Sequence, residues 1–195
     1  MSTPSMRPKS SPAGADPLAE SVARLKAAGD EPIVHYAEPG AFLFGSWKNV
    51  VIAVWEAQGT IAAVEQLARA GEIVSKAHPS GRSNIHFIAT GAGLPDADVR
   101  AKFVELMKDK ADQLACVAVV YGGTGFWASA FRSFVTGLKW LAPKSIGFHL
   151  LGTIEDAVNL VPPVHLKRTG VELDPKELRK VLEGWTAKLS RPPAP

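Results

Sequence analysis

The segment whose residue types could do chemistry lies past the middle of the chain, where residues 119–128 read VVYGGTGFWA. An apolar strand runs into four small residues and then into an apolar helix, and the four are Gly122, Gly123, Thr124 and Gly125. Gly122 and Gly125 begin a GxxGxxA pattern, which is the spacing of a dinucleotide-binding loop. The other interpretation is structural, because glycine permits a tight turn through backbone conformations with positive φ.

The residues that follow the loop do not complete a cofactor site. A dinucleotide site uses an acidic residue about 20 residues after the loop, at the end of the next strand, to hold the ribose. Here Glu155 and Asp156 come roughly ten residues later than that pattern requires. We therefore expect no cofactor, although a nucleotide-binding enzyme that uses the GGTG loop stays an alternative. The free N–H groups at the helix start also suggest that residues 122–125 bind a small anion.

No other set of residues forms a catalytic or metal-binding pattern. The histidines are scattered without paired spacing, and they are His35, His78, His86, His149 and His165. His86 and His149 fall in predicted strands, where a hydrogen-bonded structural role is the more common one. Cys116 stands in the apolar run LACVAVV without an adjacent base, which indicates a buried apolar residue rather than a nucleophile. The sequence therefore indicates no metal site and favours a protein that is not an enzyme.

Composition and charge are those of a globular chain. Of its 195 residues, 46% are hydrophobic and 21% are charged, and the net charge is +3. Seven Lys and Arg residues after His165, against four Asp and Glu, account for this excess, so we expect no nucleic-acid partner. No apolar run reaches the roughly 18 residues of a membrane span, and the N-terminus lacks the apolar core of a secretory signal. The single cysteine favours a reducing, cytoplasmic location.

The elements that must position these residues alternate between strands and helices. Strands are predicted at residues 49–57, 84–90, 116–122 and 145–152, and helices at residues 60–79, 94–114, 126–142 and 154–161. Alternation of this kind predicts a mostly parallel sheet with right-handed crossovers. Residues 41–47 add an antiparallel edge strand, because a very short turn separates them from the next apolar run. The expected fold is α/β, with a four- to five-stranded, mostly parallel sheet, an antiparallel edge strand and a C-terminal helix.

The ends of this alternating unit predict the domain organisation. A disordered tail, an α/β domain and a C-terminal helix with its tail are expected at residues 1–30, 31–163 and 164–195. The tail includes a short helix at residues 17–29. Pro162 and Pro163 are predicted to end the last helix of the domain. Asp174 is the predicted N-cap of the C-terminal helix.

The helix predicted at residues 126–142 carries more hydrophobic residues than a surface helix needs. Its largest side chains include Trp127, Phe131, Phe134 and Trp140. A helix that covers a sheet requires a single apolar stripe, so the excess indicates a second contact, with the C-terminal helix, with a second subunit or with a partner protein. We interpret these four aromatic residues as a candidate partner interface and expect at least one of the two tryptophans to face outward.

The order of elements between residues 42 and 161 resembles that of the STAS superfamily. A pair of antiparallel strands is followed by three helix–strand repeats, and the final strand leads into a short helix that contains IEDAV. The resemblance is closer to the STAS-like branch related to anti-sigma-factor antagonists and lipid-binding proteins. It implies a non-enzymatic protein-interaction or regulatory module with a protein partner or self-association, and a carrier of a small apolar or lipid ligand is an alternative.

The same resemblance suggests a regulatory position. Antagonist-type members carry a phospho-accepting Ser or Thr in the turn after the strand that corresponds to residues 84–90. In this chain the turn reads ATGAGLPD, in which Thr90 is the only hydroxyl residue and the preceding Asp of the family motif is missing. Thr90 is thus the candidate position for the phospho-switch of the family, and the missing Asp is a departure from the family motif.

Overall fold

The computed structural model describes residues 16–189, apart from the side chains of residues 125–127 and 188–189. Most of the predicted N-terminal disorder therefore lies outside the described residues. The predicted short helix is confirmed as α1, Pro17–Ala28, and its N-cap Asp16 accepts a hydrogen bond from the Leu18 amide. The helix ends at Gly29, which has a positive φ of 58°.

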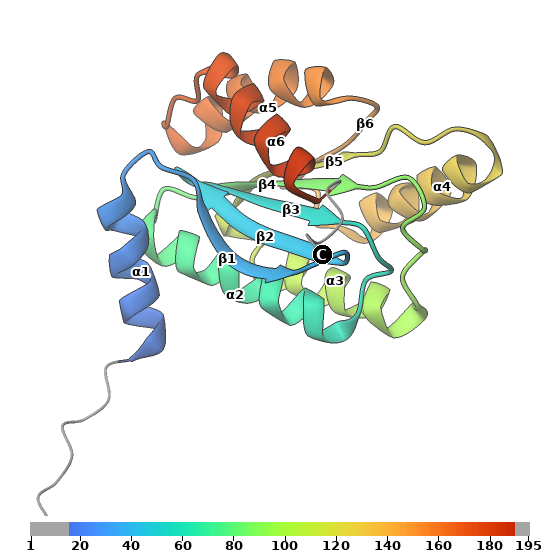
Figure 1. Cartoon of the computed structure of the whole chain (residues 1–195), viewed down its shortest axis with the longest axis horizontal. Coiled ribbons are helices and arrows are strands. Elements are labelled where there is room, and N and C mark those ends of the chain that lie inside the picture. Colours follow the sequence, from blue (N-terminus) through green and yellow to red (C-terminus); the bar gives the residue numbers. More distant parts are fainter. Residues whose placement is uncertain (1–15, 190–195) are drawn as a thin grey trace, which may run out of the picture.

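Six strands form one mixed sheet, in which the spatial order is the same as the chain order (Figure 1). They are β1 Ile33–Glu38, β2 Phe42–Trp47, β3 Val50–Trp55, β4 Arg82–Ile88, β5 Leu114–Val120 and β6 Gly147–Leu151. β1, β2 and β3 pair antiparallel, whereas β3 to β6 pair parallel. The α/β class is confirmed, but the predicted number of strands, four to five, is wrong, because the sheet has six. The sixth strand is β1, because a turn at Gly40, with a φ of 73°, lets it pair with β2.

The helices cover both faces of the sheet (Figure 1). Three crossover helices lie on the same face as α1, and they are α2 Ile61–Ala77, α3 Ala97–Asp109 and α4 Gly125–Leu141. The opposite face is covered by α5 Ile154–Thr169 and α6 Pro175–Leu189, and a 3-10 turn, Ala111–Gln113, precedes β5. Right-handed crossovers that always add the next strand at the same edge place every connecting helix on one face. The fold therefore places α3 between α2 and α4, over the central strands.

Helix α5 continues beyond the point where it was predicted to end. Pro162 and Pro163 lie in its interior, and the helix reaches Thr169 before Gly170 ends it with a φ of 71°. Each proline removes a helical hydrogen bond. Val161, Pro162 and His165 are buried against the sheet, and this packing offsets the lost hydrogen bonds. The prediction that the prolines end the helix is therefore wrong, and the expected boundary at residue 163 falls inside α5.

Helix α6 packs on the face opposite α4. Its predicted N-cap is confirmed, because Asp174 Oδ1 accepts hydrogen bonds from the amides of Lys176 and Glu177 at 2.8 and 2.9 Å. Trp185 is buried directly over Gly45 of β2, where a Cβ would collide with the indole ring. Since α6 covers β2 and β3, the C-terminal helix does not cover the hydrophobic side chains of α4.

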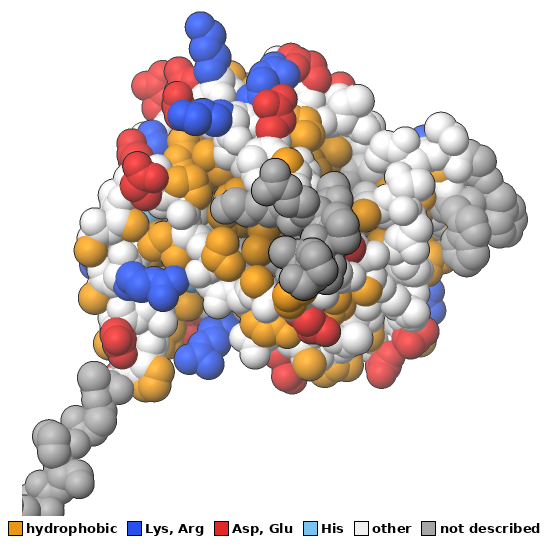
Figure 2. All heavy atoms as spheres, viewed as in Figure 1, with side chains coloured by type: hydrophobic (Ala, Val, Ile, Leu, Met, Phe, Trp, Pro, Cys, Tyr) orange, Lys and Arg blue, Asp and Glu red, His pale blue; other side chains and the backbone are white. Residues whose placement is uncertain are grey.

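The surface drawn in Figure 2 carries charges of both signs. Lys and Arg side chains intermingle there with Asp and Glu side chains. This face therefore offers no continuous basic surface of the kind that phosphate binding needs. Within residues 16–189, no helix has both the length and the hydrophobicity to cross a bilayer.

Candidate functional site

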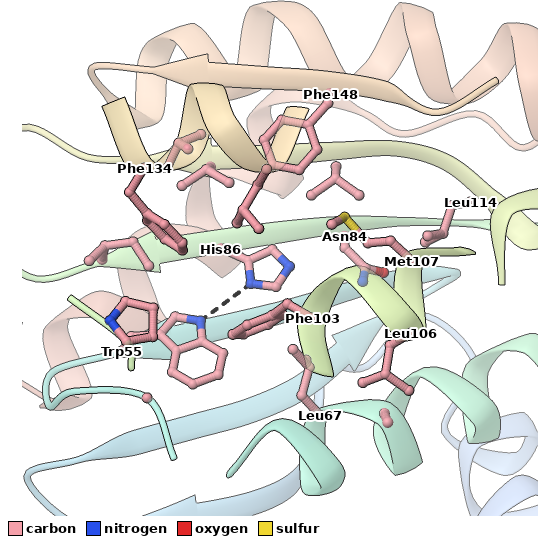
Figure 3. Close-up of a pocket in the computed structure, with 18 of the residues that line it drawn as sticks. Trp55, Leu67, Asn84, His86, Phe103, Leu106, Met107, Leu114, Phe134 and Phe148 are labelled. Carbon is pink, nitrogen blue, oxygen red and sulfur yellow. Dashed lines mark hydrogen bonds between the residues drawn. The ribbon is translucent and has the colours of Figure 1, made fainter. Parts of the chain in front are cut away.

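A cavity lies between the sheet and helix α3, with α2 and α4 beside it (Figure 3). It has a volume of about 130 Å³, and strands β3 to β6 contribute residues to its floor. Most of the lining side chains are hydrophobic, and the aromatic ones are Trp55, His86, Phe103, Phe131, Phe134 and Phe148. An engineered apolar cavity of roughly 150 Å³ binds benzene. This cavity is slightly smaller, so its size is comparable to that of a site for one aromatic ring.

Strand β4 presents polar side chains to the cavity from the centre of the sheet. Side chains along a strand alternate between its two faces. Ser83, Ile85 and Phe87 face α5 and α6, whereas Arg82, Asn84 and His86 line the cavity. Strands that are covered on both faces are normally hydrophobic throughout. Three polar residues in a row on one face of β4 therefore require an explanation.

Arg82 is buried, and two of its nitrogen atoms have no partner in the described part of the chain. Its side chain is 5% exposed, and among the described residues its Nε and Nη1 atoms have no hydrogen-bond partner. The guanidinium lies against Gly71 of α2, where a Cβ would come within 2.7 Å of Nη2. Burial lowers the pKa of Arg82 to about 10, so the group is still a cation at neutral pH. Burying an unpaired ion costs several kcal/mol, and a bound anion would remove that cost.

The other charged residues around the cavity do not neutralise Arg82. Glu72 lines the cavity one residue after Gly71, but its carboxylate pairs with Lys76 at 3.4 Å. Lys110 also lines the cavity and forms no salt bridge within the described part of the chain. The end of the cavity at the start of β4 is therefore positively charged.

Asn84 and His86 continue the polar row along β4. The Oδ1 atom of Asn84 is buried and has no hydrogen-bond partner within residues 16–189. Trp55 Nε1 donates to Nδ1 of His86 at 3.3 Å, and the two rings stack at an interplanar angle of 11°. The proton of neutral His86 is therefore on Nε2, which points away from Trp55 in Figure 3. Burial, followed by the positive charge of Arg82, lowers the pKa of His86 to about 4, so His86 is uncharged at neutral pH.

The opposite face of β4 carries a polar network, in which every member is paired. Ser83 Oγ lies 2.7 Å from His165 Nδ1, and His165 Nε2 lies 2.8 Å from Asn49 Oδ1. Because Asn49 Nδ2 donates to the Gly81 carbonyl at 2.8 Å, Asn49 Oδ1 accepts from His165, and His165 Nδ1 accepts from the Ser83 hydroxyl. Cys116, confirmed as buried, donates from Sγ to Ser83 Oγ at 3.5 Å. Ser, His and Asn are residue types of hydrolytic triads, but all three are fully buried here, so the network is structural.

The glycine-rich loop turns the chain without positive φ. Neither Gly122 nor Gly123 has a positive φ, so the turn does not use the conformational freedom that glycine provides at these two positions. Close packing explains the glycines instead, because a Cβ at Gly123 would collide with the Tyr121 ring and one at Gly122 would lie 3.2 Å from a carbonyl oxygen. Helix α4 begins at Gly125, and Thr124 is its N-cap without a side-chain capping hydrogen bond. Anion binding by this loop stays a prediction.

The four aromatic residues predicted as one interface on α4 have different environments. Phe131 is buried and Phe134 is half-buried, and both line the cavity. Trp140 is 85% exposed and lies beside Leu141, which is 57% exposed. The Trp127 side chain lies outside the described residues. Trp140 confirms that at least one of the two tryptophans faces outward.

Thr90 lies in the turn that follows β4, and its side chain is exposed. Shortly after it, Ala92, Gly93 and Pro95 line the cavity at the end of β4 opposite Arg82. The exposed hydroxyl is accessible to a modifying enzyme. The phospho-switch at Thr90 stays a prediction.

Arg82 and Asn84 are candidate functional residues that sequence reasoning does not identify. The predicted strand begins at residue 84, which leaves Arg82 outside it, whereas the hydrogen-bonded structural role predicted for His86 agrees with its hydrogen bond to Trp55. A usable signal was present, because polar residues occupy three alternate positions, 82, 84 and 86, in a segment that lies between two hydrophobic strands. That pattern marks one face of a strand as polar.

Comparisons of the chain with models of protein families, with curated proteins and with solved structures find no match. The function is therefore argued from the geometry of the cavity and from the element order. Within residues 16–189, no group of three or more His, Cys, Asp and Glu side chains is close enough together to hold a metal ion.

Proposed function

We propose that this chain is a non-enzymatic regulatory module of the STAS-like type, which binds a small, largely apolar molecule in the cavity beneath α3. The observation that carries the proposal is the cavity itself, with its aromatic lining and its buried polar row on β4. Protein interiors are close-packed, with few voids larger than a water molecule. An apolar space with a few convergent polar groups is the usual form of a small-molecule site.

The element order supports the STAS-like part of the proposal. Between residues 42 and 161 the chain contains an antiparallel strand pair, three helix–strand repeats and a helix that begins with a capping box formed by Thr153 and Asp156. This is the order on which the resemblance rests. The single buried cysteine supports a reducing, cytoplasmic location.

Helix α4 connects the cavity with the surface that a partner protein would contact. Phe134 and Leu138 line the cavity, and Trp140 and Leu141 are exposed in the next turn of the same helix. A ligand that contacts Phe134 and Leu138 would shift the preferred position of α4. Because Trp140 is on the same helix, its position at the surface would change as well. Exposed tryptophan is a residue type that often anchors protein interfaces.

Thermal melts of the full chain test the proposal, with toluene, indole and benzoate as probes. A ligand at 100 times its dissociation constant stabilises a protein by about 2.7 kcal/mol, which raises the melting temperature of a chain of this size by roughly 5–10 °C. We expect at least one probe to raise it. Val119→Phe, which fills space on the cavity floor, should abolish the shift, whereas the surface variant Trp140→Ser should keep it.

No shift with any of the three probes would contradict ligand binding in this cavity. NAD and ATP belong in the same set of melts, because the glycine-rich loop leaves a nucleotide-binding enzyme as the alternative. A shift with either nucleotide that is lost in Gly125→Val would favour that alternative instead.

A further inference from the structure

Resting on the proposed function, we propose that the ligand is a small carboxylic acid with an aromatic or branched aliphatic body. Its carboxylate binds the guanidinium of Arg82, and its body lies among the hydrophobic side chains beneath α3. Arg82 carries this inference, because the residue is only 5% exposed at one end of an apolar cavity and its Nε and Nη1 atoms have no hydrogen-bond partner among the described residues.

Arg82 has the hydrogen-bonding capacity that a carboxylate needs. A guanidinium has five N–H donors and no acceptor, and among the described residues Nε and Nη1 of Arg82 have no acceptor. Hydrogen bonds from arginine to a carboxylate are charge-assisted and roughly twice as strong as neutral ones. A bound carboxylate would therefore satisfy these donors and compensate the buried charge together.

The charges around the cavity select an anion over a neutral or cationic ligand. The carboxylate of Glu72 pairs with Lys76, and Lys110 adds a second cation to the lining. Asn84 has no charge, and His86 is neutral because its pKa is lowered to about 4. No residue of the described part of the chain supplies an anion to Arg82, so a bound ligand is the anion that we propose for it.

The size of the cavity limits the ligand to a small molecule with one anionic group. The volume of about 130 Å³ is slightly below that of a cavity that holds benzene. Arg82 is buried, whereas Lys110 is only half-buried. The buried cation therefore matches a single carboxylate, whereas a phosphate carries more charge and three acceptor oxygens. Phe103, Phe134 and Phe148, which surround the space in Figure 3, suit a flat or branched hydrocarbon body.

Isothermal titration of the full chain tests the inference with two acids and their neutral amides. The probes are benzoate against benzamide and isovalerate against isovaleramide, since each pair has nearly the same shape and differs in charge. We expect the acids to bind at least about thirtyfold more tightly than the amides, as expected for a charged hydrogen-bonding partner in a buried site. In Arg82→Met, each acid should bind no more tightly than its amide. The affinity of this variant for the amides should differ from that of the unchanged chain by less than threefold.

Lys108→Met is the matched control, because it removes an exposed cation from α3 that does not line the cavity. Its affinity for benzoate should stay within about twofold of the unchanged chain, because exposed charges contribute little. Equal affinity for acids and amides, or acid binding that survives in Arg82→Met, would overturn the inference while leaving a small-molecule site in place. Binding of neither acids nor amides would overturn both this inference and the proposed function. A cooperative melting transition of the Arg82→Met variant verifies that it is folded.

Discussion

The buried polar side chains on the two faces of strand β4 differ in their hydrogen bonding. On the face toward α5, Ser83 joins His165 and Asn49 in a network whose members are all hydrogen-bonded. On the cavity face, Arg82 and Asn84 have buried atoms without a partner within the described residues. The backbone is the same strand in both cases. The difference comes from the packed helix, because α5 supplies His165, whereas α3 supplies only hydrophobic side chains to the cavity.

The two faces of β4 therefore differ in whether their buried polar groups are hydrogen-bonded. A buried network in which each group is satisfied rigidifies and specifies a core, whereas an unsatisfied group costs free energy of folding. Proteins retain such costs mainly at functional sites. The polar row on β4 therefore makes the cavity a candidate binding site, whereas the hydrogen-bonded network on the other face belongs to the packed core.

Replacing His165 should give the largest loss of stability. His165→Leu leaves Ser83 and Asn49 buried without their partner, so we expect the free energy of unfolding to fall by about 3–5 kcal/mol. Urea titration with linear extrapolation measures this change. The affinity of the folded variant for benzoate should stay unchanged, because His165 lies on the other side of the sheet. A loss below about 1 kcal/mol would show that the network contributes little.

Acid should destabilise the protein through both faces of β4. Burial is the main cause that lowers the pKa of His86, and likewise of His165, to about 4, whereas both titrate near 6.5 in the unfolded chain. The unfolded state therefore takes up protons first, and stability falls as the pH decreases from about 6.5 to about 4. Each shift corresponds to at most about 3 kcal/mol.

Urea titrations at several pH values measure this loss. His35 has a pKa lowered to about 4 as well, by burial and by Arg24, so part of the pH dependence should remain when the other two histidines are replaced. The variant His86→Gln should reduce the slope of stability against pH between 6.5 and 4. An unchanged slope would mean that His86 is not buried as a neutral group.

Replacing Arg82 should stabilise the ligand-free protein, in contrast to the replacement of His165. Arg82→Met removes an unpaired buried cation and leaves no partner behind, so the free energy of unfolding should increase by about 1–2 kcal/mol. Arg82→Lys retains a buried cation and should show no such increase. A loss of stability in Arg82→Met would indicate that Arg82 is structural, and would remove the contrast between the two faces.

Replacing Trp140 should have the smallest effect on stability. The side chain is 85% exposed, and substitutions of exposed residues usually change the free energy of unfolding by less than about 0.5 kcal/mol. Urea titration of Trp140→Ser tests this expectation. Phe131→Ala, a change at a buried position of the same helix, is the control and should cost about 3 kcal/mol or more. A large loss in Trp140→Ser would show that Trp140 belongs to the core.

Local sequence patterns predict much of the fold, because they depend on interactions between near neighbours. Hydrophobic periodicity and capping residues predict α1, the alternation of strands and helices, and the N-cap Asp174. Local signals failed where distant contacts dominate. Helix α5 continues through Pro162 and Pro163 because its buried side meets the sheet, and Gly123 is required by the Tyr121 ring rather than by its own φ.

The cavity and its polar row depend on the tertiary structure. Periodicity predicts which face of α3 points inward, but it contains no information on how far that face lies from the sheet. The pairing of Ser83 with His165, 82 residues later in the chain, likewise arises only when α5 packs on the sheet. The same packing leaves Arg82 without a partner on the other face, because no side chain of α2, α3 or α4 in the described structure reaches it with an acceptor. A charge becomes costly only when the fold removes it from water, so the sequence supplies the arginine and the tertiary structure makes it a candidate binding residue.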